Sequence, residues 1–141
     1  MRFEVRLARA GEYPAFKKIL DAGRHPAFIG KSTMMRNSNN GGALFYDLDG
    51  EAIAVSLINP HYGILLCLNV RKEHRGHGLG AAIVNFLMPN FVRALEDKVG
   101  WFEKLSYKRI GTLKLGISLN TQIMARSALF ELVGKLKKAW E

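Results

Sequence analysis

The chain has little cysteine, few acidic residues and no long apolar run, and each shortage excludes a class of protein. A single cysteine, Cys67, leaves no disulfide framework and no cysteine-rich metal site. No apolar stretch reaches the about 18 residues of a membrane span, and residues 1–12 lack the apolar centre of a signal peptide. We therefore expect a cytoplasmic protein with no membrane segment and no metal, in which Cys67 is a buried small hydrophobic residue.

Acidic residues are outnumbered, since 12 Asp and Glu stand against 21 Lys and Arg, for a net charge of +9. The excess is uneven: residues 1–70 hold 8 basic and 6 acidic residues, whereas residues 71–141 hold 13 basic and 6 acidic ones. Two explanations remain open. The positive field can attract the phosphates of a cofactor, or it can serve an acidic partner such as nucleic acid.

The residues that are present indicate one domain built from strands and helices. At 141 residues the chain can bury one proper core. Residues 3–7 alternate like a strand, and residues 12–22 have helical apolar spacing. Residues 23–42 are polar and rich in Asn and Gly, which predicts a long irregular connection and a candidate substrate-binding loop. Asp49-Gly50, between the apolar runs 43–48 and 51–58, predicts a hairpin.

Arg75-Gly76-His77-Gly78-Leu79-Gly80 is the most informative segment, because the apolar run 63–70 precedes it and the run 81–88 follows it. This order predicts a buried central strand, a glycine-rich turn, and a helix that Pro89 ends. Glycines leave the backbone amides uncovered, and the start of the helix adds free N–H groups and the positive end of its dipole. The segment therefore predicts a phosphate site, to which Arg75 adds charge and forked hydrogen bonds.

Spacing separates the possible nucleotide-binding motifs. A dinucleotide fingerprint requires G-x-G-x-x-G, but here the third glycine comes one position early, and Glu96 lies in a charged segment rather than at the end of a strand. A phosphate loop ending in Gly30-Lys31-Ser32 would need a glycine where His25 stands. Both motifs fit poorly.

Residues 70–80 instead resemble the acyl-CoA-binding motif of the GNAT superfamily of N-acyltransferases, with Arg75, Gly78 and Gly80 at its three defining positions. The resemblance implies an α/β (α+β) fold with a mixed, mostly antiparallel central sheet flanked by helices, as a single domain over residues 1–141. It implies acetyl-CoA as co-substrate, an unidentified amine acceptor, and a monomer or homodimer. The turn and the preceding strand would bind CoA through Leu68, Asn69, Val70, Arg75, Gly76, His77, Gly78, Leu79 and Gly80.

Two alignments of the C-terminal half compete under this resemblance. In one, residues 101–108 match the family segment Tyr-x-x-x-Gly-Phe, with Phe102 in place of the tyrosine and Ser106 in place of the glycine. In the other, residues 114–119 form a late strand, Asn120 follows it as a CoA-binding residue, and residues 121–140 form an amphipathic helix. Residues 98–111 are then an insertion or an extra hairpin. We favour the second because its element lengths are more regular.

Candidates for the chemistry are few. The resemblance implies an oxyanion donor on the backbone of the central strand, at Val70 or Asn69. His61 is a candidate base, because histidine is the side chain best suited to proton transfer near neutral pH, and Ser127 and Tyr107 are candidate acids for the leaving thiolate. Neither alignment supplies the family's usual tyrosine, and the strand over residues 61–70 has no carboxylate. Two alternatives therefore stay open: an enzyme that modifies nucleic acid or an amine bound to it, and a degenerate GNAT protein that binds CoA or a partner without catalysis.

Overall fold

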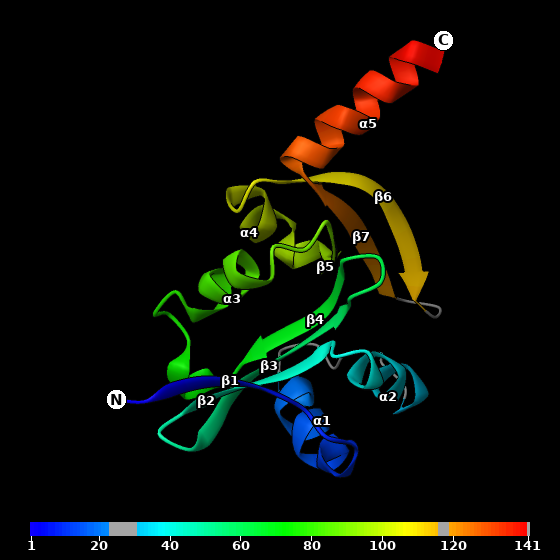
Figure 1. Ribbon diagram of the computed structural model, residues 1–141. Coiled ribbons are helices and arrows are strands. Elements are labelled where there is room, and N and C mark those ends of the chain that lie inside the picture. The colour runs from blue at the N-terminus through cyan, green and yellow to red at the C-terminus, as the bar shows by residue number, and fades with distance from the viewer. Residues whose placement is uncertain (23–30, 116–118, 141) are drawn as a thin grey trace. The chain divides into compact units, whose positions relative to one another are not determined.

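The computed structural model describes residues 1–22, 31–115 and 119–140, and these form two compact units, Met1–Met88 and Pro89–Glu141 (Figure 1). Three single-turn 3-10 helices, Ala10–Glu12, Lys72–His74 and Glu96–Lys98, connect larger elements. In the described part of the chain, no helix is both long and apolar enough to cross a membrane.

The first unit is built on four strands in the order β1 (Phe3–Leu7), β2 (Ala43–Leu48), β3 (Glu51–Asn59) and β4 (Ile64–Val70). Each strand pairs antiparallel with the next. The predicted hairpin between β2 and β3 is confirmed, and its turn residues Asp49 and Gly50 have φ of 50° and 85°. Asp and Gly suit this turn because both tolerate positive φ.

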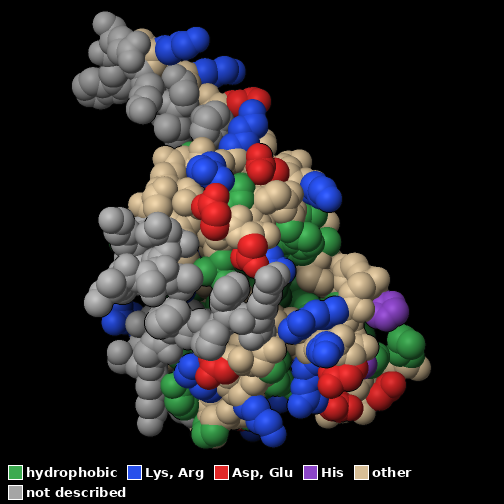
Figure 2. Space-filling view, turned by 180° about the vertical axis from the view of Figure 1, so that it is seen from behind, with side chains coloured by type: hydrophobic (Ala, Val, Ile, Leu, Met, Phe, Trp, Pro, Cys, Tyr) green, Lys and Arg blue, Asp and Glu red, His purple; other side chains and the backbone are tan. Residues whose placement is uncertain are grey.

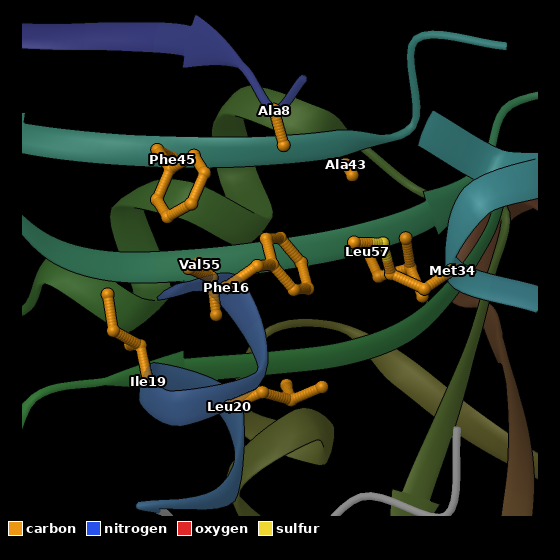
Figure 3. Close-up of a cluster of buried hydrophobic side chains, with 9 residues drawn as sticks. All are labelled: Ala8, Phe16, Ile19, Leu20, Met34, Ala43, Phe45, Val55 and Leu57. Atoms are coloured by element: carbon orange, nitrogen blue, oxygen red, sulfur yellow. The ribbon is translucent and has the colours of Figure 1, made fainter. Parts of the chain in front are cut away.

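Helices cover both faces of this sheet. α1 (Tyr13–Asp21) and α2 (Lys31–Asn39) pack on one face, where Phe16 meets Phe45 edge-on with ring centroids 5.6 Å apart (Figure 3). α3 (Leu79–Leu87) packs on the other face, where Ile83 contacts a cluster that includes Tyr46 and Val70. Residues of β4 contribute to both clusters, so the strand before the glycine turn is apolar on both faces, as predicted.

The prediction of an irregular connection over residues 23–42 is wrong for residues 31–39, which form α2; residues 23–30 lie outside the described part. Met34 is 1% exposed in the first core cluster and fixes this helix against the sheet. The Asn and Gly residues that suggested a loop end the helix instead, because Gly41 takes φ 78° and its N–H donates to Ser38 O. Burial of one face of α2 therefore outweighs the weak helix propensity of its sequence.

The second unit contains β5 (Phe91–Leu95), α4 (Val99–Lys104), β6 (Tyr107–Leu115), β7 (Leu119–Arg126) and α5 (Ser127–Trp140). β7 lies between β5 and β6 and pairs antiparallel with both. Val92, Ala94, Met124 and Ala125 are almost fully buried in this sheet.

The favoured C-terminal alignment is wrong. Residues 121–126, predicted as the start of a helix, belong to the strand β7, and α5 begins only at Ser127. The apolar spacing of residues 121–126 did not indicate a strand. β7 is hydrogen-bonded along both edges and buried on both faces, so its sequence lacks the alternation of apolar and polar residues that marks a half-buried strand. The other alignment agrees with the structure: Ser106, at the family's glycine position, has φ 70° and directly precedes β6.

Candidate active site

The glycine turn joins the end of β4 to the start of α3, as the sequence predicts. Gly76 and Gly78 have φ of 83° and 81°, values that side chains other than glycine rarely adopt. The first hydrogen bond of α3 runs from the Ala82 N–H to Gly78 O, at 3.0 Å. The N–H groups of Leu79, Gly80 and Ala81 therefore lie ahead of the helical ladder, where an anion can accept from them.

Open space surrounds this turn. A Cβ placed on Gly76 or Gly78 would meet no heavy atom within 4 Å, and His77 between them is exposed. A phosphate group can therefore approach the backbone from solvent without displacing a side chain. The residues present thus fit a pyrophosphate, which is part of the CoA that the resemblance assigned to them.

Arg75 ties the turn to the strand before it. Its Nε donates to Val70 O at 2.7 Å, and its Nη2 donates to Asn69 Oδ1 at 3.2 Å. These bonds use two of the five N–H groups of the guanidinium, so the rest remain for an anion at the turn. Arg75 therefore holds the shape of the turn in addition to supplying charge.

Asn69 extends this network to α1. Its Nδ2 donates to Ile19 O at 2.7 Å, and Ile19 lies in the last turn of α1, where carbonyls lack helical partners. One side chain thus links a helix end to the arginine of the glycine turn. The sequence carried a signal for this role that we did not use, because Asn69 is the one polar residue in the apolar run 63–70.

We expect Asn69→Ala to lower the free energy of unfolding by about 1–2 kcal/mol, because Ile19 O and the Arg75 guanidinium each lose a partner. CoA affinity should fall several-fold as Arg75 loses its anchor. Urea unfolding and calorimetric titration measure the two effects. Asn85→Ala, at an exposed position on α3, is the control and should change stability by less than about 0.5 kcal/mol. Equal values for the two variants would show that the Asn69 bonds contribute nothing.

The register of β4 separates the two candidate oxyanion donors. The Arg71 N–H donates to Ile53 O at 2.8 Å, and Asn69 lies opposite Val55 two residues earlier. Antiparallel pairs alternate, so the Asn69 backbone bonds toward β3, whereas the backbone groups of Val70 and Leu68 point away from β3. Val70 O accepts a hydrogen bond from Arg75 Nε, which agrees with this direction. Val70 N–H is therefore the better candidate of the two.

His61 lies in the turn between β3 and β4, at the opposite end of β4 from the glycine turn. The seven residues of β4 span roughly 20 Å, so the structure does not bring His61 to the glycines. The His61 side chain is exposed, and its ring stands edge-on to Tyr62 with centroids 4.6 Å apart. Its role as a base remains a prediction.

Tyr107 and Ser127 lie at the same end of the β6–β7 hairpin in the second unit. Tyr107 pairs with Arg126, and Ser127 is the next residue along the chain. Each hydroxyl donates to a backbone carbonyl: Tyr107 to Pro89 O at 2.6 Å, and Ser127 to Ser106 O at 2.7 Å. Burial raises the pKa of Tyr107, whose phenol would be protonated at neutral pH even at its ordinary pKa of about 10.

Tyr107→Phe should lower the free energy of unfolding by about 1–3 kcal/mol, because Pro89 O would lose its buried donor. Denaturant unfolding measures this loss, with Tyr62→Phe at an exposed position as the control. A role as acid would add a drop in kcat that stability does not explain. Unchanged stability and unchanged kcat together would remove Tyr107 from both roles.

The remaining sequence candidates are placed as follows. Asn120 lies within β7 opposite Lys114, so it does not follow a strand as the rejected alignment assumed, and its assignment to CoA loses its basis. Phe102, at the family's tyrosine position, is 7% exposed and packs between Trp101 and Tyr107. Cys67 is half-buried against the first core cluster. Among the described residues, no three His, Cys, Asp or Glu side chains gather closely enough to hold a metal ion.

A cleft elsewhere in the first unit is less suited to an anion than the glycine turn is. It is a cleft of about 730 Å³ whose lining includes Arg6, Arg9, Glu12 and Ser38. Arg6 donates to Asp47 Oδ2 at 2.7 Å and to both Glu12 oxygens, so its charge is already balanced. Burial alone raises the pKa of Glu12, but hydrogen bonds from Arg6 and Arg9 lower it below its usual range. This carboxylate therefore stays ionised and paired.

No protein-family model matches the chain, and no curated protein matches it in sequence. Solved structures do match. Arabidopsis thaliana Naa50, in complex with a bisubstrate analogue of CoA and a peptide, is 13% identical with a TM-score of 0.70, over 90% of this chain and 99% of that chain. The ribosomal-protein-S18-alanine N-acetyltransferase of Escherichia coli is 14% identical with a TM-score of 0.66, over 88% of this chain and 92% of that chain. GphF, a GNAT-like decarboxylase in complex with isobutyryl-CoA, is 13% identical with a TM-score of 0.66, over 88% and 99%.

These similarities show the fold. The chain has the GNAT fold, and its glycine turn after β4 occupies the position that the motif predicted. The expected α/β class, with a mostly antiparallel sheet flanked by helices, is confirmed.

Proposed function

We propose that the protein is an acyl-CoA-dependent N-acyltransferase that transfers an acetyl group from acetyl-CoA to an amine, in the cytoplasm. The observation that carries the proposal is the glycine turn, where exposed amides with open space above them begin α3 directly after an apolar strand. We also infer that the two units make one acyltransferase domain over residues 1–141. This is supported by the match to Naa50, which covers 99% of that protein's chain.

In this proposal, bound acetyl-CoA supplies an activated thioester and the protein positions it. The N–H groups of Leu79, Gly80 and Ala81, with the remaining donors of Arg75, hold the pyrophosphate. The backbone groups of Leu68 and Val70 that point away from β3 bond the pantetheine arm, and Val70 N–H donates to the carbonyl oxygen where negative charge develops. Holding the amine nitrogen against the thioester carbon supplies much of the remaining rate enhancement. His61 as base and Ser127 or Tyr107 as acid complete the proposed set.

The acceptor we favour is the amine of a peptide or protein. Naa50 was solved with a peptide-bearing bisubstrate analogue, and the Escherichia coli neighbour is named for an alanine of a ribosomal protein. The decarboxylase GphF shows that this fold also carries other reactions, so fold alone does not assign the acceptor. A panel of acceptors is therefore needed.

A nucleic-acid acceptor is the second candidate, and the net charge of +9 favours it. On the face that Figure 2 shows, Lys and Arg side chains are interspersed with Asp and Glu rather than gathered into one patch, which argues against nucleic-acid binding on that face. Binding to DNA or RNA that weakens steeply with added salt would support it. Unchanged mobility of a nucleic-acid probe at low salt would count against it.

The test is release of free CoA from acetyl-CoA in the presence of peptides with different N-terminal residues, polyamines and oligonucleotides, followed by mass spectrometry of the acceptor. A gain of one acetyl group on an amine, with CoA release in equal amount, supports the proposal. CoA binding without turnover of any acceptor would favour the degenerate protein that binds but does not catalyse. Loss of the acyl group without transfer would indicate a different reaction.

A further inference from the structure

β1 leaves one edge and one apolar stripe uncovered. Among the strands that the structure describes, none pairs with the edge of β1 that faces away from β2 (Figure 1). Phe3, Val5 and Leu7 alternate along one face of β1 and are 47%, 39% and 58% exposed. Proteins usually protect such an edge with a short strand, charged side chains, proline or a bulge, because it can pair with another strand. β1 is short and carries Glu4 and Arg6, but it contains no proline, and its register with β2 is continuous.

The hydrogen bonds of β1 define which backbone groups are open. The Ala8 N–H donates to Ala43 O at 2.9 Å, and the Asp49 N–H donates to Arg2 O at 2.7 Å. Because bonded pairs alternate along an antiparallel ladder, the even residues of β1 bond to β2. The N–H and C=O groups of Phe3, Val5 and Leu7 therefore point away from β2.

We propose that a second copy of this chain pairs with that edge, antiparallel and centred on Val5, to form a two-fold homodimer. In this register Val5 faces Val5 of the second copy, and Phe3 faces Leu7. Each of these pairs exchanges two backbone hydrogen bonds and brings apolar side chains together on one face. A two-fold axis requires such a self-complementary patch.

The charges of Glu4 and Arg6 also distinguish this register from its neighbours. Within one chain Glu4 already pairs with Arg2, and Arg6 already pairs with Asp47 and Glu12, so charge adds only a small preference to the apolar contacts and open backbone groups. Centring on Val5 places Glu4 opposite Arg6 of the second copy, and Arg6 opposite Glu4. A slip of two residues places Glu4 opposite Glu4 in one direction, and Arg6 opposite Arg6 in the other. A slip of one residue places the odd residues of one β1 opposite the even residues of the other β1. The N–H and C=O groups of those even residues already bond to β2. Only the Val5-centred register joins apolar contacts, unlike charges and open hydrogen-bonding groups.

The test is a pair of cysteine variants in a Cys67→Ala background. Val5→Cys places two thiols across a bonded antiparallel pair, where Cα atoms about 5.5 Å apart suit a disulfide. Leu7→Cys is the matched control, because in the proposed register its counterpart lies four residues away, roughly 13 Å along the strand. We expect mild oxidation to convert most of the Val5→Cys protein, and little of the Leu7→Cys protein, into a dimer of two 15.8 kDa chains. Equal cross-linking of both variants would overturn the register.

Sedimentation tests the dimer without oxidation. We expect wild type to sediment as a dimer, and Val5→Pro as a folded monomer, because its lost N–H points away from β2. Glu4→Arg should weaken the dimer by placing like charges opposite each other, whereas Glu131→Arg, an equal charge change at an exposed residue of α5, should not. Circular dichroism checks that each variant folds. A wild-type monomer at concentrations up to about 1 mM, or a dimer that persists in Val5→Pro, would overturn the proposal.

Discussion

Gly78→Val is expected to weaken CoA binding by at least about 30-fold, or about 2 kcal/mol. Gly78 has φ 81° and is the N-terminal cap of α3. A β-branched residue is strained at that angle, and its side chain would fill the space through which a phosphate reaches the amides. The turn would shift away from its anion-binding shape. Calorimetric titration of CoA into the purified variant measures the loss.

Gly50→Val is the matched control. Gly50 has φ 85° in the β2–β3 hairpin, and a Cβ there would also meet nothing within 4 Å. It therefore carries similar backbone strain in the same unit, remote from the glycine turn in sequence. We expect a similar loss of stability in both variants and a loss of CoA affinity in Gly78→Val alone. Equal affinities in the two variants would mean that the glycine turn does not hold the cofactor.

Gly42→Ala is expected to lower the free energy of unfolding by about 2–3 kcal/mol. Gly42 is buried where α2 meets β2, and a Cβ there would overlap the backbone oxygen of Ile58 and approach the backbone oxygen of Asn37. Both are main-chain atoms, and Gly42 also bonds to these two residues, so the strands must move apart to admit a methyl group. Urea unfolding with a two-state fit measures the cost.

The control for Gly42 is Gly100→Ala in α4, where a Cβ would meet nothing within 4 Å. Alanine at an open helical position should leave stability unchanged or raise it by about 0.5–1 kcal/mol. A loss in Gly100→Ala as large as that in Gly42→Ala would show that any added methyl group is harmful. The close approach at Gly42 would then explain nothing.

The parts of the fold that the sequence predicted share a local cause. Asp49-Gly50 has one favoured turn geometry, and Gly76 and Gly78 adopt positive φ directly before a helix, so the hairpin and the candidate phosphate turn followed from short-range chemistry. Pro89 ended α3 for a similarly local reason. The resemblance of residues 70–80 to the GNAT motif then led to the fold that the solved structures show.

The errors have a tertiary cause. α2 forms because Met34 is buried beneath a polar, Asn-rich sequence, and no local signal reports that burial. β7 is hydrogen-bonded on both edges, so its buried residues give no clean alternation. The link from Asn69 to Ile19 joins residues 50 positions apart, and spacing along the chain carries no information about such a pair. In the candidate site, the turn could therefore be predicted, but its supports could not.

The most direct test of the central claim is calorimetric titration of acetyl-CoA, and of CoA, into wild type and into Arg75→Glu. The account predicts binding of one molecule per chain to wild type. It also predicts a loss of at least tenfold in Arg75→Glu, because a carboxylate would replace a cation beside a pyrophosphate and would face Val70 O, which now accepts from Arg75. Wild-type protein that binds neither molecule would contradict the account. Affinity that is unchanged by Arg75→Glu would show that the cofactor lies elsewhere.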